Sequence, residues 1–414
     1  MRSMKYVILH AGGMADAPRQ ELAGATPLQA ASTPNLDRIT QTGELGLLML
    51  PESSRYGSGW TGTAILGYEP KKHYQGPGPL EAVSLGVAVG EHDVVYRCTM
   101  VTLKGEPHSS SKTGNEFKKL GPQLVMDDAT AGLITTAEAR ELIDAVNEQL
   151  GSEVIQFYPG SGHRHLMVWV NGKPRAVCMD PQSLVGRPLG DALPSGDGAD
   201  MLRKLMDASL LILRGHPLND ERIEAGNKPA NCLWLWGEGR AVVWPSLTER
   251  FRVSGAVVSS SDVHRGLGMM AGLGNGTDGE NLAAADWRTQ ARRALEQLRA
   301  KDFAYIHLEL PDEVVYGTEV KAKLRAIEDI DREYIGPFVE GLNALGPYRL
   351  LIVCDPGTAQ DKVLPGQWFY AYYDSSQKSE SPTKRRFTEA DAQSSPLPQR
   401  DATKFVVRLF SKSA

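Results

Sequence analysis

The segment RYGSGWTGTAILGYEP, residues 55–70, places a serine between glycines just before a short apolar run. The flanking glycines let the backbone bend sharply around Ser58. Residues 61–66 then have the composition of a short helix, which Gly67 would end. A serine hydroxyl at such a turn lies beside free backbone N–H groups and the positive end of a helix dipole, an environment that suits an anion or a nucleophile. A glycine-rich surface turn without a chemical role explains the same pattern.

Four apolar runs elsewhere in the chain have the pattern of buried parallel strands. They end near His10 and Gly12, near Ser260 and Asp262, near Glu309 and Asp312, and near Cys354 and Asp355. Because the carboxyl ends of parallel strands meet at one edge of a sheet, where α/β proteins bind ligands, we expect Asp312 and Asp355 to be neighbours there. A role for each Asp as a helix N-cap explains the pattern equally well.

The patterns of strands, helices and turn residues along the chain indicate two domains. After the glycine- and proline-rich residues 76–79, strand and helix patterns alternate, and a capping box of Thr135 and Glu138 opens a helix. The buried-strand pattern returns at Gly255. We therefore predict one domain formed by residues 1–75 and 252–414, interrupted by a smaller domain of residues 76–251. The polar, proline-bearing residues 375–400 are expected to be partly mobile.

Composition and charge exclude several classes of protein. A net charge of −5 and a pI near 6.0 give no basic surface for nucleic acid. No apolar run is long enough to span a membrane, and the first residues lack a signal-peptide pattern. The four cysteines are scattered without a CxxC motif, which is typical of reduced thiols. We therefore expect a cytoplasmic protein whose partners are small molecules, and the sequence leaves its oligomeric state open.

Short motifs follow one another in a fixed order along almost the whole chain. They include GMAD at 13–16, TPNLDR at 33–38, LGYEP at 66–70, GPLEA at 78–82, KPAN at 228–231, LWLWG at 233–237 and PDE at 311–313. In these motifs the chain resembles the archaeal-type cofactor-independent phosphoglycerate mutases of the alkaline phosphatase superfamily. The resemblance implies an alkaline-phosphatase-like α/β domain with a parallel sheet and an inserted smaller α/β domain.

The resemblance also implies an isomerase of glycolysis that moves the phosphoryl group of 2- or 3-phosphoglycerate. In the family a serine, here Ser58, carries the phosphoryl group between the two positions. Two divalent metal ions, Mn or Zn, lower the serine pKa and neutralise charge on the transferred group. The residual ligands for these ions are Asp312 and Asp355.

Several positions depart from the family pattern. The Asp that binds metal in the family's first loop is Gly12 here, and the Asp and Asn that follow the nucleophile are Gly59 and Gly62. Two histidine ligands are replaced by Tyr316 and Pro356, and a third has no counterpart. The remaining ligands are too few for two ions that each need four to six. The sequence therefore predicts less than one tightly bound divalent metal per chain.

A missing metal centre leaves Ser58 without an activator, for which His10, His264 and His307 are candidate substitute bases. The alternative for each is an ordinary structural histidine. The resemblance further implies that polar residues facing an interdomain cleft hold the anionic groups of the substrate. The candidates are Arg164, His165, Arg222, Lys228, Asn231, Asp262 and Arg265. Surface ion pairs are the alternative for these residues.

Three functions agree with the sequence. The first is a divergent enzyme that transfers a phosphoryl group on a small phosphorylated acid through a rebuilt site. The second is a non-catalytic protein that binds a phosphorylated or anionic metabolite or has a regulatory role. The third is an ordinary mutase whose metal ligands occupy other positions than those named above.

Overall fold

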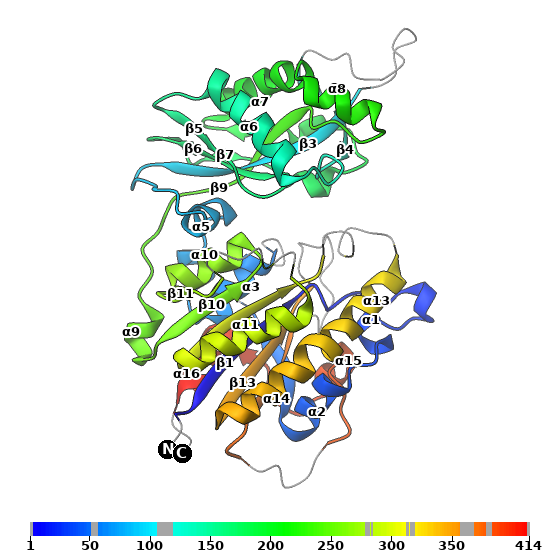
Figure 1. Ribbon diagram of the computed structural model, residues 1–414, viewed down its shortest axis with the longest axis vertical. Helices are drawn as coiled ribbons and strands as arrows, with labels where there is room; N and C mark the ends of the chain where they lie inside the picture. The colour runs from blue at the N-terminus through cyan, green and yellow to red at the C-terminus, as the bar shows by residue number, and fades with distance from the viewer. Residues whose placement is uncertain are drawn as a thin grey trace. The chain divides into compact units, whose positions relative to one another are not determined.

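The computed structural model describes residues 3–50, 57–105, 119–277, 282, 285–311, 314, 319–356, 368–377 and 383–411. The chain forms two compact units (Figure 1): unit 1 comprises Met1–Tyr74 and Val243–Ala414, and unit 2 comprises Gln75–Val242. The second boundary precedes the one expected at 252. Helix α9 (Leu247–Phe251) belongs to unit 1, because its first N–H donates to the carbonyl of Ala271.

Unit 1 is built on an eight-stranded sheet. Its strands follow the order β11 (Gly274–Asn275), β10 (Gly255–Ser259), β12 (Phe303–Glu309), β1 (Lys5–Gly12), β13 (Tyr348–Cys354), β14 (Phe369–Asp374), β2 (Glu44–Met49) and β15 (Arg400–Asp401). The strands from β11 to β13 are mutually parallel, whereas β14 is antiparallel to both of its neighbours. The predicted α/β class is therefore confirmed, and the four predicted apolar strands are the adjacent strands β10, β12, β1 and β13.

The expected closeness of Asp312 and Asp355 at the edge of the sheet stays a prediction. Strand β1 lies between β12 and β13, the strands that lead to these two residues. Asp312 itself lies outside the described residues. The order of strands cannot be read from apolar patterns, because each of these strands is buried on both faces and looks alike in sequence.

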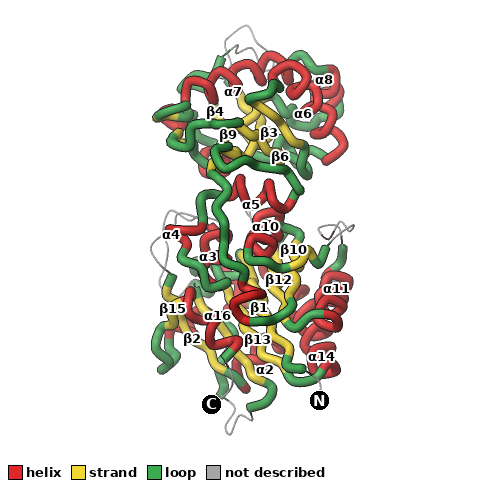
Figure 2. The backbone as a smooth tube through the Cα atoms, turned by 90° about the vertical axis from the view of Figure 1, so that its left-hand side faces the viewer, coloured by secondary structure: helices red, strands yellow, loops and turns green. Residues whose placement is uncertain are grey.

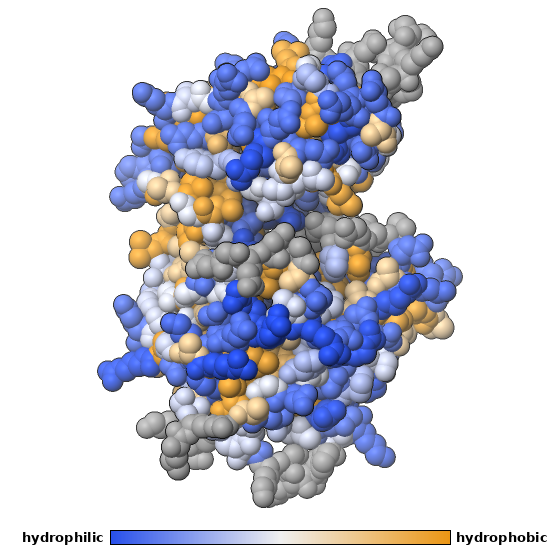
Figure 3. All heavy atoms as spheres, in the orientation of Figure 1, coloured by the Kyte–Doolittle hydropathy of each residue, from blue (hydrophilic) through white to orange (hydrophobic). Residues whose placement is uncertain are grey.

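Two layers of helices cover this sheet on opposite faces (Figure 2). One layer contains α2 (Pro34–Thr42), α11 (Trp287–Ala300), α13 (Val320–Asp329), the π-helical turn Ile330–Ile335 and α14 (Gly336–Leu345), and the other contains α3 (Gly57–Ile65), α10 (Asp262–Met270) and α16 (Ala402–Phe410). Shorter helical segments are Gln20–Leu22, α1 (Pro27–Ala30), α4 (Pro70–His73) and α15 (Glu389–Gln393). Helix α11 buries Ala291, Ala294 and Leu298 and presents hydrophilic residues outward (Figure 3).

Alternate residues of β1 face the two layers, as the two-residue period of a strand requires. Val7 and Leu9 join the apolar core beneath α2, α11 and α14. On the opposite face, the ring of Tyr6 contacts Phe410 of α16, and the ring of His10 contacts His264 of α10. The polar side chain of β1, His10, therefore lies on the face of the sheet that is covered by α3, α10 and α16.

Unit 2 has its own sheet and its own core. The strands are β3 (Val94–Lys104), β4 (Val125–Asp128), β5 (Ile155–Tyr158), β6 (Arg164–Trp169) and β9 (Cys232–Gly239), with a separate pair β7 (Ala176–Val177) and β8 (Ser195–Gly196). The helices are α5 (Pro77–Ser84), α6 (Thr136–Leu150), α7 (Ala199–Arg214) and α8 (Pro217–Glu224), with short turns Pro181–Leu184 and Gly190–Ala192. The predicted capping box of Thr135 and Glu138 is confirmed at the start of α6. Of the helices described in either unit, none is long and apolar enough to cross a membrane.

Partial mobility over 375–400 stays a prediction, and residues 378–382 lie outside the described part, whereas residues 383–400 make contacts with the body of unit 1. Phe387 is fully buried and packs against Phe369 of β14. The carboxylate of Glu389 accepts a hydrogen bond from Thr26 Oγ1 at 2.8 Å. The contacts of Phe387 and Glu389 thus attach this segment to unit 1, although its average composition is that of a loop.

The carboxyl-terminal helix α16 is held by an internal ion pair. Arg349 Nε of β13 donates to Asp374 Oδ2 of β14 at 2.8 Å, and Arg349 Nη1 donates to the carbonyl of Leu409 at 3.0 Å. Both charged side chains are almost fully buried. The pair therefore connects two strands to the last helix.

We predict that Arg349→Ala lowers the free energy of unfolding by about 3 kcal/mol or more, because it leaves the carboxylate of Asp374 buried without its partner. Urea unfolding followed by circular dichroism measures the change. The matched control is Arg332→Ala, which removes an exposed arginine paired with Asp329 and is expected to unfold like the wild type. Equal stability of the two variants would contradict the prediction.

Candidate functional site

The parallel register of unit 1 brings polar side chains together at the carboxyl ends of its central strands. His10 of β1 is paired with His307 of β12, and His307 is paired with Ser259 of β10. Asp355 directly follows the last residue of β13. All four residues are buried. The edge of the sheet where ligands bind in open α/β folds is therefore lined by histidine, serine and aspartate.

His10 is held on both of its ring nitrogens. Its Nε2 lies 2.8 Å from Asp355 Oδ2, and its Nδ1 lies 3.2 Å from the hydroxyl of Tyr305. The other carboxylate oxygen of Asp355 accepts a hydrogen bond from the backbone N–H of Gly13 at 3.3 Å. Asp355 therefore fixes the orientation of the His10 ring and the loop that follows β1.

His264 enters the same region from the first turn of α10. Its Nδ1 lies 2.7 Å from the Tyr305 hydroxyl. Its ring is stacked on that of His307, with centroids 3.4 Å apart and planes 8° apart. His307 Nδ1 lies 3.2 Å from Ser259 Oγ, whereas His307 Nε2 is buried with no hydrogen-bond partner among the described residues.

Burial sets the protonation of this cluster. It lowers the pKa of His264 well below its ordinary value, and the nearby rings of His307 and His10 lower it further. Burial also lowers the pKa of His307, with His10 adding to the shift and Asp355 opposing it. The pKa of the Tyr305 hydroxyl is raised well above its ordinary value by burial and by Asp355. At neutral pH, His264 and His307 are therefore neutral and Tyr305 is protonated.

Two glycines make room for the cluster. A Cβ at Gly12 would lie 2.8 Å from His307 Nε2. A Cβ at Gly62 of α3 would lie 2.9 Å from the Tyr305 hydroxyl and 3.1 Å from Cε1 of His264. The family resemblance implies Asp and Asn at these two positions, which stays a prediction. The histidines and the tyrosine occupy the space that those side chains would need.

The described residues do not fit the two-metal centre that the family resemblance implies. Gly12 offers no ligand atom, and the Oδ2 atom of Asp355 is bound to His10. Asp312 and Tyr316 lie outside the described residues, and nothing is described of the Ser58 side chain. Neutral imidazoles are nevertheless good ligands for metal ions and good acceptors of protons, so the cluster is suited to either role.

The remaining predicted residues of unit 1 lie beside the cluster. Asp262 and Arg265 occupy the first turn of α10 and form an ion pair. Arg265 Nη1 also donates to the carbonyls of Ser259 and Ser260 at 3.2 and 3.0 Å. Arg265 thus ties the start of α10 to the end of β10, and its predicted contact with an anion stays a prediction.

The predicted residues of unit 2 fall into two groups. Arg222 is buried. Its guanidinium group donates to the carboxylate of Glu138 at 2.7 Å and to the carbonyl of Ala131 at 2.7 Å. The buried Asn231 side chain bridges the N–H and the carbonyl of Leu103 at 2.8 Å each. Lys228 pairs with two aspartates at the end of β4. These contacts are internal to unit 2, and a role in binding substrate stays a prediction for all three side chains.

Arg164 and His165 begin β6 and face opposite sides of its sheet. Arg164 is exposed, whereas His165 is buried and accepts the backbone N–H of Gly160 on Nδ1 at 3.1 Å. Burial lowers the pKa of His165 to about 3, so this histidine is neutral at physiological pH. Of the two, Arg164 is the exposed side chain, and a contact of either residue with an anion stays a prediction.

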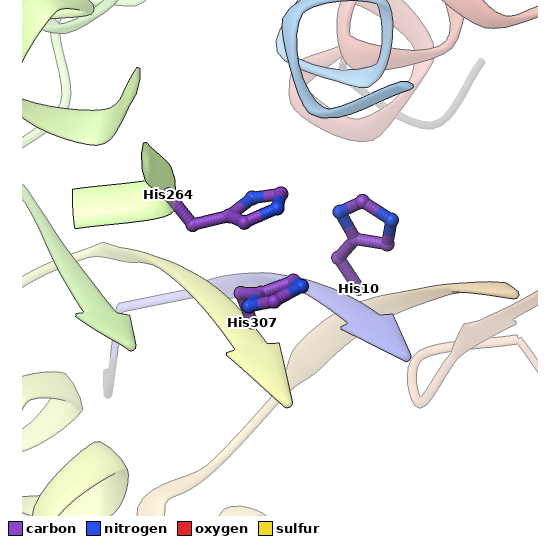
Figure 4. Close-up of side chains that lie close together, drawn as sticks. All are labelled: His10, His264 and His307. Atoms are coloured by element: carbon purple, nitrogen blue, oxygen red, sulfur yellow. The ribbon is translucent and has the colours of Figure 1, made fainter. Parts of the chain in front are cut away.

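The sequence analysis named His10, His264 and His307 as separate candidate bases and did not predict that the three side chains lie together (Figure 4). It missed Tyr305 altogether. The missed signal is the two-residue period: Phe303, Tyr305 and His307 alternate along β12, so a tyrosine and a histidine share one face. The register that aligns them with His10 is not contained in the sequence of either strand.

Known proteins are similar to this chain in sequence and in fold. The sequence profile of the 2,3-bisphosphoglycerate-independent phosphoglycerate mutase family matches residues 40–219. A protein of Geobacter sulfurreducens named "Probable 2,3-bisphosphoglycerate-independent phosphoglycerate mutase" is 42% identical over 360 residues, covering 86% of each chain. A mutase of the same name, without "Probable", from Methanothrix thermoacetophila is 37% identical over 364 residues, covering 86% of each chain.

Two solved structures share the fold. The PH0037 protein from Pyrococcus horikoshii gives a TM-score of 0.71 at 21% identity and covers the whole of both chains. The cofactor-independent phosphoglycerate mutase from Thermoplasma acidophilum gives a TM-score of 0.57 at 22% identity and covers 99% of this chain and 100% of that one. At these identities the two structures support the fold alone.

We predict that Gly12→Ala destabilises unit 1 by about 1–3 kcal/mol, because the added methyl group overpacks the buried ring of His307. In a His307→Ala background the same substitution is expected to cost at least about 1 kcal/mol less, since the colliding ring is gone. A double-mutant cycle by urea unfolding measures this coupling. Gly274→Ala is the control, because its Cβ meets only ordinary contacts. Equal costs of Gly12→Ala in both backgrounds would refute the steric explanation.

Proposed function

Because the chain belongs to the family of 2,3-bisphosphoglycerate-independent phosphoglycerate mutases, we propose that it transfers a phosphoryl group on a small phosphorylated acid such as 2- or 3-phosphoglycerate. In this proposal Ser58 is the residue that accepts the phosphoryl group. The histidine cluster of unit 1, defined as His10, His264 and His307, takes over part of the proton chemistry of the usual two-metal centre.

The position of Ser58 on α3 is the observation that carries this proposal. Gly57 has a φ of 64°, a left-handed conformation that glycine adopts without strain, and Ser58 follows it in the first turn of the helix. Gly62 lies one turn further along the helix, and a Cβ at this position would lie 2.9 Å from the Tyr305 hydroxyl and 3.1 Å from Cε1 of His264. The free N–H groups of the first turn of α3 and the positive end of its dipole would favour the attack of a serine at this turn on a phosphoryl group.

Arg164 and Arg265 are proposed as contacts for the anionic groups of the substrate. Arginine binds phosphate or carboxylate with two parallel hydrogen bonds and needs no metal ion to do so. Removing Arg164 is expected to leave the fold intact because its side chain is exposed. Arg265 is less suitable for a test, because it also holds the end of β10.

We predict that wild-type protein interconverts 3- and 2-phosphoglycerate and that Ser58→Ala reduces turnover by about 10³-fold or more, because the acceptor hydroxyl is lost. An enolase-coupled assay, run separately with Mn²⁺ and with Zn²⁺, measures the rate. Ser183→Ala removes an exposed hydroxyl in unit 2 and serves as the control. Binding of 3-phosphoglycerate without turnover by the wild type would instead favour the non-catalytic binding protein.

We predict that Arg164→Ala weakens the binding of 3-phosphoglycerate by about tenfold or more, since a charge-assisted hydrogen bond contributes about 1.5–3 kcal/mol. Titration calorimetry on the Ser58→Ala protein measures affinity without turnover. Arg175→Ala removes an exposed arginine of the same unit and is expected to bind like its parent. If both arginine variants bind equally well, Arg164 is not part of the substrate site.

A further inference from the structure

We propose that unit 1 binds one small oxyanion of the phosphate type at a site formed by Trp368, Tyr370 and Arg400, the Arg400 site. Tyr370 lies on β14, Trp368 directly precedes that strand, and Arg400 lies on β15. Each of the three side chains has a buried hydrogen-bond donor, and none of these donors has a partner among the described residues. The inference concerns anion binding alone and does not depend on the phosphoryl transfer proposed above.

The pairing of the strands brings the three side chains to one face of the sheet. Arg400 is paired with Leu48 of β2, whose N–H donates to the carbonyl of Trp368 at 3.0 Å. Tyr370 is paired with Gly46, two residues before Leu48 on the same strand. Paired residues, and residues two positions apart on a strand, share a face. Trp368, Tyr370 and Arg400 therefore lie on one face, where the ring of Tyr370 contacts α16.

Gly46 allows the ring of Tyr370 to lie across β2. A Cβ at this glycine would lie 3.0 Å from both the hydroxyl oxygen and Cε1 of Tyr370. Since β2 separates β14 from β15, the hydroxyl is on the side of the ring toward Arg400. Burial raises the pKa of Tyr370, and the neighbouring guanidinium group of Arg400 opposes this shift. The hydroxyl and the guanidinium group are thus neighbours.

Arg400 carries a positive charge that no described carboxylate balances. The charged groups that act on the Tyr370 hydroxyl are Arg400, Glu44 and Arg408. Glu44 is already bound to Arg408, with its Oε2 2.7 Å from Nη1. Asp401, the next residue after Arg400, accepts hydrogen bonds from the first turn of α16. One positive charge is therefore left over at this place, and it attracts an anion.

The donors indicate the chemistry of the ligand. Buried polar groups in folded proteins nearly always have a partner, so three unpaired donors on one face indicate a missing acceptor. Trp368 Nε1–H and Arg400 Nε–H can only donate, and the Tyr370 hydroxyl can donate as well. Phosphate has several acceptor oxygens and a negative charge, and arginine binds it with parallel hydrogen bonds. Trp368 and Arg400 are partly exposed, so an anion from solution can reach them.

The Arg400 site is separate from the histidine cluster. Phe369 of β14 is paired with Cys354, the residue before Asp355, so Trp368 lies at the same edge of the sheet as the cluster. Strand β14 is two strands away from β1, which at about 4.8 Å per strand separates the two places by roughly 10 Å. One phosphate ion does not span that distance. The Arg400 site is thus a second place for an anion at the edge where ligands bind.

Nuclear magnetic resonance of the indole groups tests the site in the full-length wild-type protein. The chain has seven tryptophans, and a Trp368→Phe variant identifies the indole N–H signal of Trp368 by its loss. We expect inorganic phosphate at millimolar concentration to shift this signal until it saturates. Sodium chloride at equal ionic strength is expected to leave the signal in place, because screening by salt is not specific to a site.

Variants assign the ligand contacts. Arg400→Gln is expected to weaken phosphate binding by at least about tenfold, and Tyr370→Phe by about threefold. Lys404→Gln removes an exposed cation of α16 and is the matched control, expected to bind phosphate as the wild type does. Arg164→Ala is expected to leave this binding unchanged, which separates the Arg400 site from the proposed substrate contact. Circular dichroism and thermal unfolding establish that each variant is folded.

Three results would overturn the proposal. The first is wild-type protein in which phosphate causes no saturable shift of the Trp368 signal. The second is the same shift with sodium chloride. The third is unchanged phosphate affinity of folded Arg400→Gln protein. Each result is read from anion binding, so a failure of phosphoglycerate turnover leaves the inference untouched.

Discussion

The candidate site depends on one constraint, the parallel register between β1 and β12. This register sets His10 beside His307, and the pairing of β12 with β10 extends the row to Ser259. A shift of one residue in either pairing would turn one of the histidines to the opposite face of the sheet, into the core under α11 and α14. Because both faces are covered by helices, the register is strongly specified by burial. The fold therefore fixes the chemistry of the site through backbone hydrogen bonds.

The histidines fit into the site only because the neighbouring positions 12 and 62 are glycines. The ring of His307 fills the space that a side chain at Gly12 would need, and the Tyr305 hydroxyl and the His264 ring do the same at Gly62. Densely packed interiors do not tolerate such additions singly, since overpacking is destabilising. Any side chain at position 12 would thus require a different residue at 307.

The sequence predicted the fold well, because its signals are local. Apolar runs identified β10, β12, β1 and β13, and the capping box identified the start of α6. The same local signals do not contain the order of the strands, and they do not indicate that Asp355 pairs with His10. His10 and Asp355 are 345 positions apart in the chain, and nothing in either segment indicates a hydrogen bond of 2.8 Å. Long-range pairing of this kind is a property of the assembled sheet.

Burial also sets the electrostatics of the site. The neutral rings of His264 and His307 carry no charge, and the carboxylate of Asp355 is shared with His10 and Gly13. A phosphoryl group is an anion, and a buried region of low dielectric constant strengthens the effect of every charge near it. Neutral imidazoles are good acceptors of protons but do not offset the negative charge of a phosphoryl group. The cluster is therefore suited to moving protons, whereas any charge that balances a phosphoryl group has to come from other groups.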